Sequence, residues 1–160
     1  MKQLLIGRHA KSSWDIEVAD IDRSLTYRGI LDAYKIGNAY LEHQMPLDWI
    51  YCSPAQRALH TASIFCRVTQ HSMERFTISE SLYDFSGEQI IQYLRGIDDR
   101  HQSVGIFGHN HAVTHVVSWL LGSAIAEIPT AGIYVIQSQV DRWEEFKSGS
   151  KLIQLQPKNL

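Results

Sequence analysis

Short apolar runs alternate along the chain with longer stretches in which apolar residues recur at helical spacing. The short runs predict buried strands, and they lie at 4–6, 49–52, 76–78, 104–108, 133–136 and 152–155. The stretches with helical spacing predict amphipathic helices, and they lie at 26–43, 53–66, 86–94 and 109–122, with a short helix around Trp143.

This alternation favours an α/β fold with three layers, in which helices cover both faces of a mostly parallel sheet. The last run follows the fifth after a short connection, so we expect an antiparallel strand near the C-terminus, at or near an edge. Capping residues support the helices. Thr26 is expected to cap the first, Ser53 with Gln56 the second, and Ser86 with Gln89 the third.

The composition limits the possible functions. Residues 1–160 are expected to form a single domain, with 44% apolar and 20% charged residues. The net charge of −2 argues against nucleic-acid and membrane partners. No apolar run has the length of a transmembrane helix, and we expect no signal peptide before the first strand. Cys52 and Cys66 are interpreted as reduced core residues, so we expect a cytoplasmic protein.

Cationic and imidazole side chains follow three of the expected strands. Arg8 and His9 come directly after the first strand, Arg57 lies just past the second, and His109 follows the run that ends at Gly108. Ligands of open α/β sheets bind at the carboxyl ends of strands. Two guanidinium groups, an imidazole and the amides of a helix start suit a phosphate dianion. No Ser, Cys or Asp is suitably placed as a nucleophile, whereas the His9 imidazole can itself attack phosphorus.

Three motifs in order are similar to those of the histidine phosphatase superfamily. They are Gly7-Arg8-His9-Ala10, Ser53-Pro54-Ala55-Gln56-Arg57-Ala58 with Thr61-Ala62, and Gly108-His109-Asn110. Within that superfamily the chain resembles the small SixA-like phosphohistidine phosphatases. The segments that carry this closer resemblance are Arg8–Trp14, Asp22–Thr26 with Gly29, and Pro157–Leu160. The chain departs from the usual pattern at Ala10, where Gly is usual, at Ser24, where Pro is common, and at His111, where many relatives have Pro.

The resemblance implies a phosphoglycerate-mutase-like fold and a phosphatase that acts on phosphohistidine in a protein. His9 would be the nucleophile that becomes phosphohistidine. Arg8, Arg57 and His109 would bind the phosphoryl oxygens and stabilise the transition state. Ser12 and Asp15, in the polar and acidic loop after the first strand, are further candidates for substrate binding. No metal or other cofactor would be required.

The general acid is less clearly marked. Relatives that cleave esters use a carboxylic acid after the third strand, and the loop there offers Glu80 and Asp84. The family pattern places the acid two residues after a Leu, which points from Leu82 to Asp84 and leaves Glu80 as the alternative. The leaving imidazole of phosphohistidine can already be protonated, so loss of this acid is expected to slow ester cleavage more than phosphohistidine cleavage.

Three alternatives remain open at this point. The substrate could be a small phosphate ester, although the short segment between Arg57 and His109 leaves little room for a cap over the site. The chain could instead be a phosphoprotein-binding module without catalysis, although all four central residues are present. His111 and His115 have the spacing of helical metal ligands, but no Glu between them and no Cys pair supports a metal site.

Overall fold

The first apolar run forms strand β1 (Lys2–Arg8), which lies inside a six-stranded sheet. The computed structural model describes residues 1–160. The strand order is β3-β2-β4-β1-β5-β6. The other strands are β2 (Trp49–Cys52), β3 (Phe76–Ile78), β4 (Ser103–Gly108), β5 (Ile133–Ser138) and β6 (Ser150–Leu155). The strands β3, β2, β4 and β1 run parallel, so their carboxyl ends meet at one edge of the sheet.

The C-terminal strands complete the sheet as a hairpin. β5 pairs antiparallel with β1, and β6 pairs antiparallel with β5 at the edge of the sheet. The expected antiparallel pairing and edge position of the last strand are therefore confirmed. Because two reversals restore the direction, β6 runs the same way as β1, and β5 is the one strand that opposes the rest.

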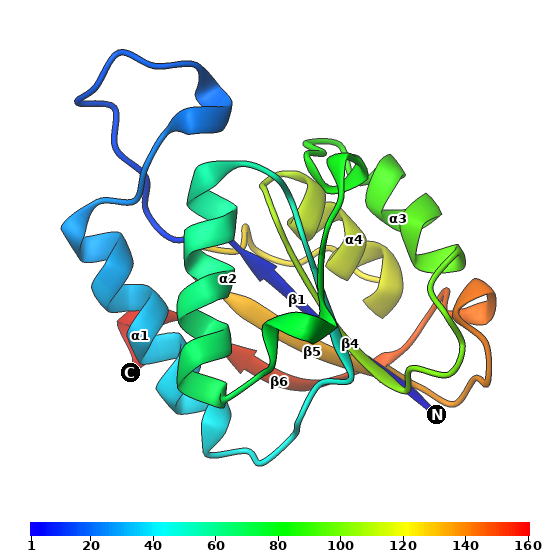
Figure 1. Ribbon diagram of the computed structural model, residues 1–160. Coiled ribbons are helices and arrows are strands. Elements are labelled where there is room, and N and C mark those ends of the chain that lie inside the picture. The colour runs from blue at the N-terminus through cyan, green and yellow to red at the C-terminus, as the bar shows by residue number, and fades with distance from the viewer.

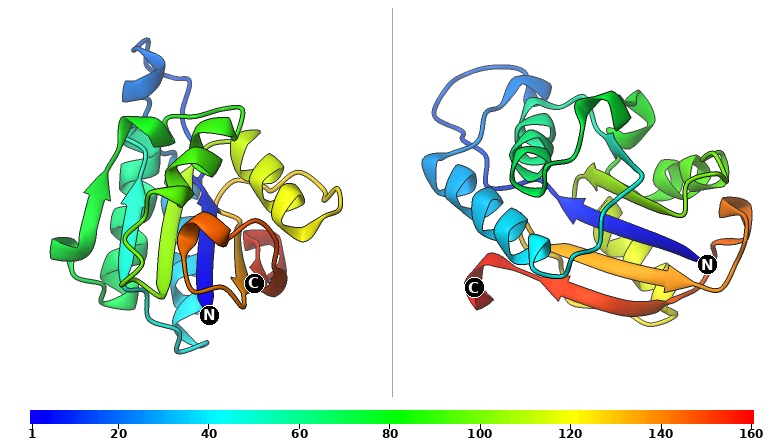
Figure 2. Two further views of the ribbon diagram at one scale, coloured as in Figure 1. Left: turned by 90° about the vertical axis from the view of Figure 1, so that its right-hand side faces the viewer. Right: turned by 60° about the horizontal axis from the view of Figure 1, so that its bottom comes forward.

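Helices cover both faces of the sheet, as the alternation predicted (Figures 1 and 2). One face carries α1 (Tyr27–Leu41) and α2 (Gln56–Thr69), and the other carries α3 (Glu88–Arg95) and α4 (Ala112–Leu121). Successive strand side chains point to opposite faces, so Leu5 packs in the core under α1 and α2, whereas Leu4 and Ile6 pack in the core under α3 and α4. None of the helices is long and apolar enough to cross a membrane.

The helix starts agree only in part with the expected caps. The Thr26 hydroxyl caps α1 by accepting a hydrogen bond from the Gly29 amide at 2.9 Å. The prediction for Ser53 is wrong, because α2 begins at Gln56 with Ala55 as its N-cap and no side-chain capping bond. The Ser86 prediction is also wrong, because the N-cap of α3 is a glycine and another side chain caps that helix. The Ser53 hydroxyl instead contacts His109, and the Ser86 hydroxyl donates to the Asp84 carboxylate.

The predicted core role of the two cysteines is confirmed. Cys52 and Cys66 are both buried free thiols on the α1–α2 side of the sheet. Burial raises the pKa of the Cys66 thiol to about 11 and that of Cys52 well above its ordinary value. Neither thiol is therefore poised for nucleophilic chemistry.

Candidate active site

The His9 side chain lies at the carboxyl end of β1 with its orientation fixed by backbone bonds. Its amide donates to the Gly108 carbonyl, and its own carbonyl accepts from the Ala131 amide, each at 3.0 Å. The ring nitrogen Nδ1 lies 2.7 Å from the Ala10 carbonyl oxygen. Because a carbonyl can only accept, Nδ1 carries the ring proton. The other ring nitrogen, Nε2, is therefore unprotonated, and its lone pair accepts a hydrogen bond from Arg57 Nε at 3.3 Å.

The buried position keeps the His9 ring uncharged. Desolvation is the main cause that lowers the pKa of His9 to about 4. The hydrogen bond to the Ala10 carbonyl opposes this shift, while the charges of Arg57 and Arg8 add to it. Near neutral pH, His9 thus presents an unprotonated nitrogen flanked by guanidinium groups, which is the state required of a nucleophile.

Arg57 lies in the first turn of α2, where its side chain is buried against the loop that follows β1. Its Nη1 donates to the Asp20 carbonyl oxygen at 2.6 Å, and its Nη2 donates to Asp20 Oδ2 at 2.9 Å. With Nε directed to His9, all three guanidinium nitrogens have partners. The helix therefore holds a planar fork of donors beside the nucleophilic nitrogen.

Arg8 reaches the site from the last position of β1. Its Nη1 donates to the Ile128 carbonyl oxygen at 2.8 Å and lies 3.7 Å from the Glu127 carboxylate. Its Nε is buried and has no hydrogen-bond partner in the protein. A buried donor without a partner is costly, so this N–H is available to an anion that enters beside His9.

His109 follows β4 and packs next to His9, with the two ring centroids 5.2 Å apart. The Ser53 hydroxyl lies 2.8 Å from His109 Nε2 and already accepts the Ala55 amide. The Ser53 hydroxyl can donate its proton to Nε2, and in that tautomer the ring proton of His109 is on Nδ1. That nitrogen is buried without a partner. Desolvation, followed by the charges of His9 and Arg57, lowers the pKa of His109 to about 3. His109 thus offers a neutral N–H donor.

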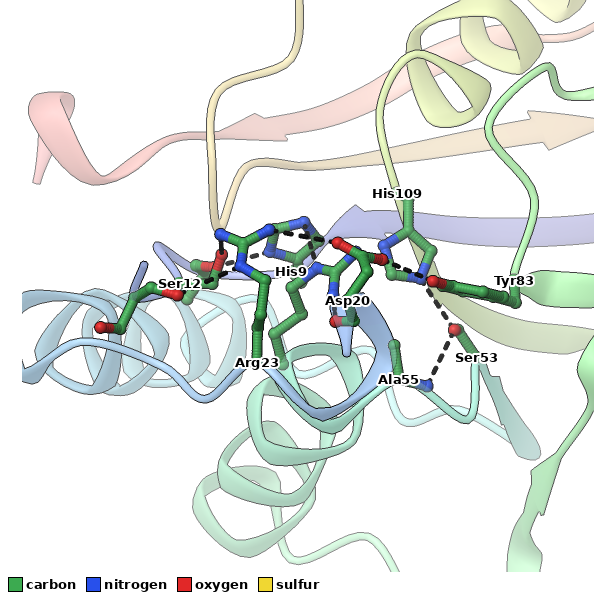
Figure 3. A network of polar contacts seen from close by, with 11 residues as sticks. His9, Ser12, Asp20, Arg23, Ser53, Ala55, Tyr83 and His109 are labelled. Carbon is green, nitrogen blue, oxygen red and sulfur yellow. Dashed lines mark hydrogen bonds and ion pairs between the residues drawn. The ribbon is translucent and has the colours of Figure 1, made fainter. Parts of the chain in front are cut away.

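The loop between β1 and α1 places the Asp20 carboxylate between Arg23 and Tyr83 (Figure 3). Asp20 accepts from Arg57, from the Tyr83 hydroxyl and from Arg23 Nη1 at 3.4 Å. Partial burial would raise the pKa of Asp20, but the hydrogen bonds from Tyr83 and Arg57 outweigh it and lower the pKa to about 2. An ionised carboxylate therefore contacts three donors next to His9, in an arrangement that a phosphoryl group could also use.

Asp20 and Tyr83 were not found by sequence reasoning. Asp20 is one of four acids in the stretch 15–22, and no periodicity or motif separates it from the other three. Tyr83 comes from the loop after β3, where the sequence directed attention to carboxylates. Only the folded loops bring these two side chains together.

The two candidates for substrate binding in the first loop have different positions. The Ser12 hydroxyl accepts from Arg23 Nη2 at 2.6 Å, so it fixes an arginine at the rim of the site. The Asp15 side chain is exposed and makes no hydrogen bond or ion pair, while its amide donates to the Ser13 hydroxyl at 3.0 Å. Ser12 is thus connected to the site through Arg23, and Asp15 stands apart from it.

The Asp84 carboxylate caps helix α3. It is buried and accepts the amides of Ser86, Gly87, Gln89 and Ile90 at 3.0–3.1 Å, together with the Ser86 hydroxyl. All of these groups donate hydrogen bonds to the two carboxylate oxygens of Asp84. The carboxylate is therefore not placed to donate a proton to a leaving group. Glu80 is exposed in the turn Glu80–Leu82, and its side chain makes no hydrogen bond. The neighbours of Asp84 reach the site instead, because the rings of Tyr83 and Phe85 pack against His109.

The histidine pair with helical spacing lies outside this arrangement. His111 is the N-cap of α4 and is exposed at the rim, next to Asn110, and His115 is exposed one turn later. The structure contains no group of three or more His, Cys, Asp or Glu side chains that could hold a metal ion. The positive charge beside His9 is supplied by arginines.

Comparisons with known proteins show the family and the fold of this chain. The family model described as histidine phosphatase superfamily (branch 1) matches residues 4–87. An uncharacterised protein of Mycobacterium leprae is 29% identical over 157 residues, covering 88% of this chain and 91% of that protein. The protein histidine phosphatase SixA complexed with tungstate has the same fold, with a TM-score of 0.84, 21% identity and 98% of both chains covered. Mycobacterial glucosyl-3-phosphoglycerate phosphatase also shares the fold, with a TM-score of 0.68, 12% identity and coverage of 94% and 96%.

Proposed function

The chain belongs to the histidine phosphatase superfamily (branch 1), and on that premise we propose that it hydrolyses phosphohistidine on a protein through a covalent intermediate at His9. One observation carries the proposal. His9 Nε2 is unprotonated, buried and 3.3 Å from Arg57 Nε, while Nδ1 is held by the Ala10 carbonyl. This is the geometry of an imidazole nucleophile with a fixed tautomer.

In the first step His9 Nε2 attacks the phosphorus atom of the substrate. A bond forms between Nε2 and phosphorus while the bond from phosphorus to the substrate nitrogen breaks. The other ring nitrogen of the substrate already carries a proton, so the imidazole leaves as a neutral molecule. Since Nδ1 of His9 keeps its proton, the phosphorylated ring carries a positive charge, and the Ala10 carbonyl stabilises it through the 2.7 Å hydrogen bond. In the second step water attacks phosphorus, phosphate leaves and Nε2 regains its lone pair.

We assign the binding of the phosphoryl oxygens to three groups. Arg57 offers a planar fork, whereas Arg8 Nε and His109 Nδ1 are buried donors without protein partners. Such preorganised donors each contribute roughly 10²-fold to the rate in comparable sites. Two nitrogens of Arg57 are bonded to Asp20. A phosphoryl dianion therefore has to compete with the Asp20 carboxylate, and its greater charge favours it in that exchange.

The lack of a free carboxyl group beside His9 favours phosphohistidine over an ester. Asp84 is occupied as a helix cap, and Glu80 is exposed. An alkoxide leaving group needs a proton from a positioned acid, whereas a protonated imidazole leaves without one. Small phosphate esters remain the second candidate, because a glucosyl-3-phosphoglycerate phosphatase has the same fold.

A substrate panel tests this choice. We expect kcat/KM for phosphohistidine to exceed the values for phosphoserine, phosphotyrosine and sugar phosphates. A preference for a sugar phosphate would replace the proposal with its second candidate. Binding of phosphohistidine without release of phosphate would instead identify a binding module.

A further inference from the structure

The loop that carries Asp20 presents a row of large apolar side chains to solvent. Trp14, Ile16 and Val18 have exposed fractions of 78%, 66% and 44%. They lie in residues 14–22, hereafter the arm, whose loop projects at one end of the molecule beside α2 (Figures 1 and 2). Neighbouring exposed apolar residues at one end of a fold mark a binding surface more often than isolated ones.

The arm is built as a firm element. Its stem is a short antiparallel pairing in which the Ser13 amide donates to the Ser24 carbonyl at 2.8 Å and the Thr26 amide to the Lys11 carbonyl at 2.9 Å. Helix α1 approaches this stem so closely that a Cβ at Gly29 would lie 2.2 Å from the Lys11 carbonyl oxygen. The stem therefore fixes both ends of the arm, which lowers the entropic cost of docking.

The arm is also joined to the nucleophile's surroundings. Asp20 bonds to Arg57 from the end of the arm. Arg23, directly after the arm, contacts Ser12 and Asp20 and lies over the Trp14 ring at 3.3 Å from its centroid. A protein that carries the phosphoryl group into the site therefore comes close to the arm.

The negative charge of the arm indicates which kind of protein surface it would bind. Acids alternate with the apolar residues, and the arm contains no Lys or Arg. Asp20 is engaged in the site, but Asp15, Glu17 and Asp22 are exposed and take part in no ion pair. Their complement is a surface that is both apolar and basic.

We infer that the arm is the docking surface for the phosphoprotein, and that it selects phosphohistidine flanked by apolar and basic residues. This inference rests on the proposed function, because it assumes that the phosphoryl group arrives on a protein. The phosphohistidine enters beside His9 while its apolar neighbours contact Ile16 and Val18. Its basic neighbours pair with Asp15 and Glu17.

Two short synthetic peptides phosphorylated on histidine with phosphoramidate test the inference. One has lysine and leucine around the phosphohistidine, and the other has glutamate in place of lysine. Free phosphohistidine serves as the minimal substrate. Because complementary charges act on encounter and selectivity, we expect kcat/KM for the lysine peptide to exceed that for the glutamate peptide by about tenfold.

The variants separate docking from chemistry. The double variant Ile16→Ser, Val18→Ser is expected to lose most of the gain on the lysine peptide and to hydrolyse free phosphohistidine as the wild type does. The matched control Met73→Ser, Leu152→Ser removes two exposed apolar residues from other elements and should change neither value. The charge reversal Asp15→Lys, Glu17→Lys should invert the preference between the peptides. Equal losses on all substrates, or no loss with the lysine peptide, would overturn the docking role.

A binding measurement distinguishes failure of this inference from failure of the proposed function. The unphosphorylated peptides are titrated into the His9→Ala protein, which retains the arm. If no phosphohistidine substrate is hydrolysed but the arm variants still weaken lysine-peptide binding, the docking surface stands and the proposed function fails. If the peptides are hydrolysed and bound alike by wild-type and arm-variant protein, the docking surface fails and the proposed function stands.

Discussion

Acidification should destabilise this protein through its two buried imidazoles, because the fold keeps both uncharged. The pKa of His9 is lowered to about 4 and that of His109 to about 3, mainly by desolvation. The ordinary histidine value of 6.5 applies once the chain unfolds. Below that pH the unfolded chain binds protons that the folded site cannot take up. The free energy of unfolding therefore falls as pH drops from about 6.5 towards about 4.

Linkage gives the size of the effect. Each ring contributes a loss of about 2 kcal/mol between pH 7.5 and pH 5, so the pair together contributes about 4 kcal/mol. This is a large part of the total stability of a small domain. Keeping the pH at or above 5 separates the effect from Asp20, whose pKa of about 2 makes it respond only in stronger acid.

Urea unfolding at several pH values measures this loss. His109→Gln removes one ring, so its loss between pH 7.5 and pH 5 should be smaller than that of the wild type by about 2 kcal/mol. The matched control His43→Gln removes an exposed histidine and should leave the loss unchanged. His71, whose pKa is also lowered by burial, contributes equally to all three proteins and cancels in the comparison. An identical pH dependence in His109→Gln and the wild type would refute the reasoning that burial holds these rings neutral.

Other predictions concern the chemistry. Arg57→Lys loses the planar fork of donors, so kcat/KM should fall on the order of 10²-fold, and Arg8→Ala should cause a similar loss. Full activity of Arg57→Lys would show that bidentate geometry is not needed. Asp84→Asn weakens the cap of α3 and should lower stability by about 1–2 kcal/mol with equal effects on ester and phosphohistidine cleavage; a selective loss of ester cleavage would instead assign Asp84 the acid role. Turnover should survive a metal chelator, and loss of activity that zinc restores would draw attention to His111 and His115.

The sequence predicted the strand ends well because hydrophobic runs and motifs are local signals. Arg8, His9, Arg57 and His109 all lie where the strand-to-helix transitions suggested, and the sheet brings the two imidazoles within 5.2 Å. Parallel strands share one carboxyl edge, so residues that follow them meet whatever their distance in the chain. This geometric rule explains why the amino-acid sequence alone predicts a central site.

The details that sequence reasoning missed depend on loops. Ser53 looked like a helix cap, yet its hydroxyl contacts His109 because α2 begins later. Asp84 looked like a free acid, yet it accepts the amides at the start of α3. No sequence feature distinguishes Asp20, because its partners Arg57 and Tyr83 come from the first turn of α2 and from the loop after β3. Contacts of this kind are set by tertiary packing rather than by spacing.

Trapping of the covalent intermediate tests the central claim most directly. The protein is mixed with labelled phosphohistidine, quenched within the first turnovers and digested. We predict one labelled peptide that contains His9, with a phosphate bond that is labile in acid and stable in base, and no label in His9→Ala. An adduct on another residue, an acid-stable adduct, or turnover by His9→Ala within about tenfold of the wild type would contradict the account.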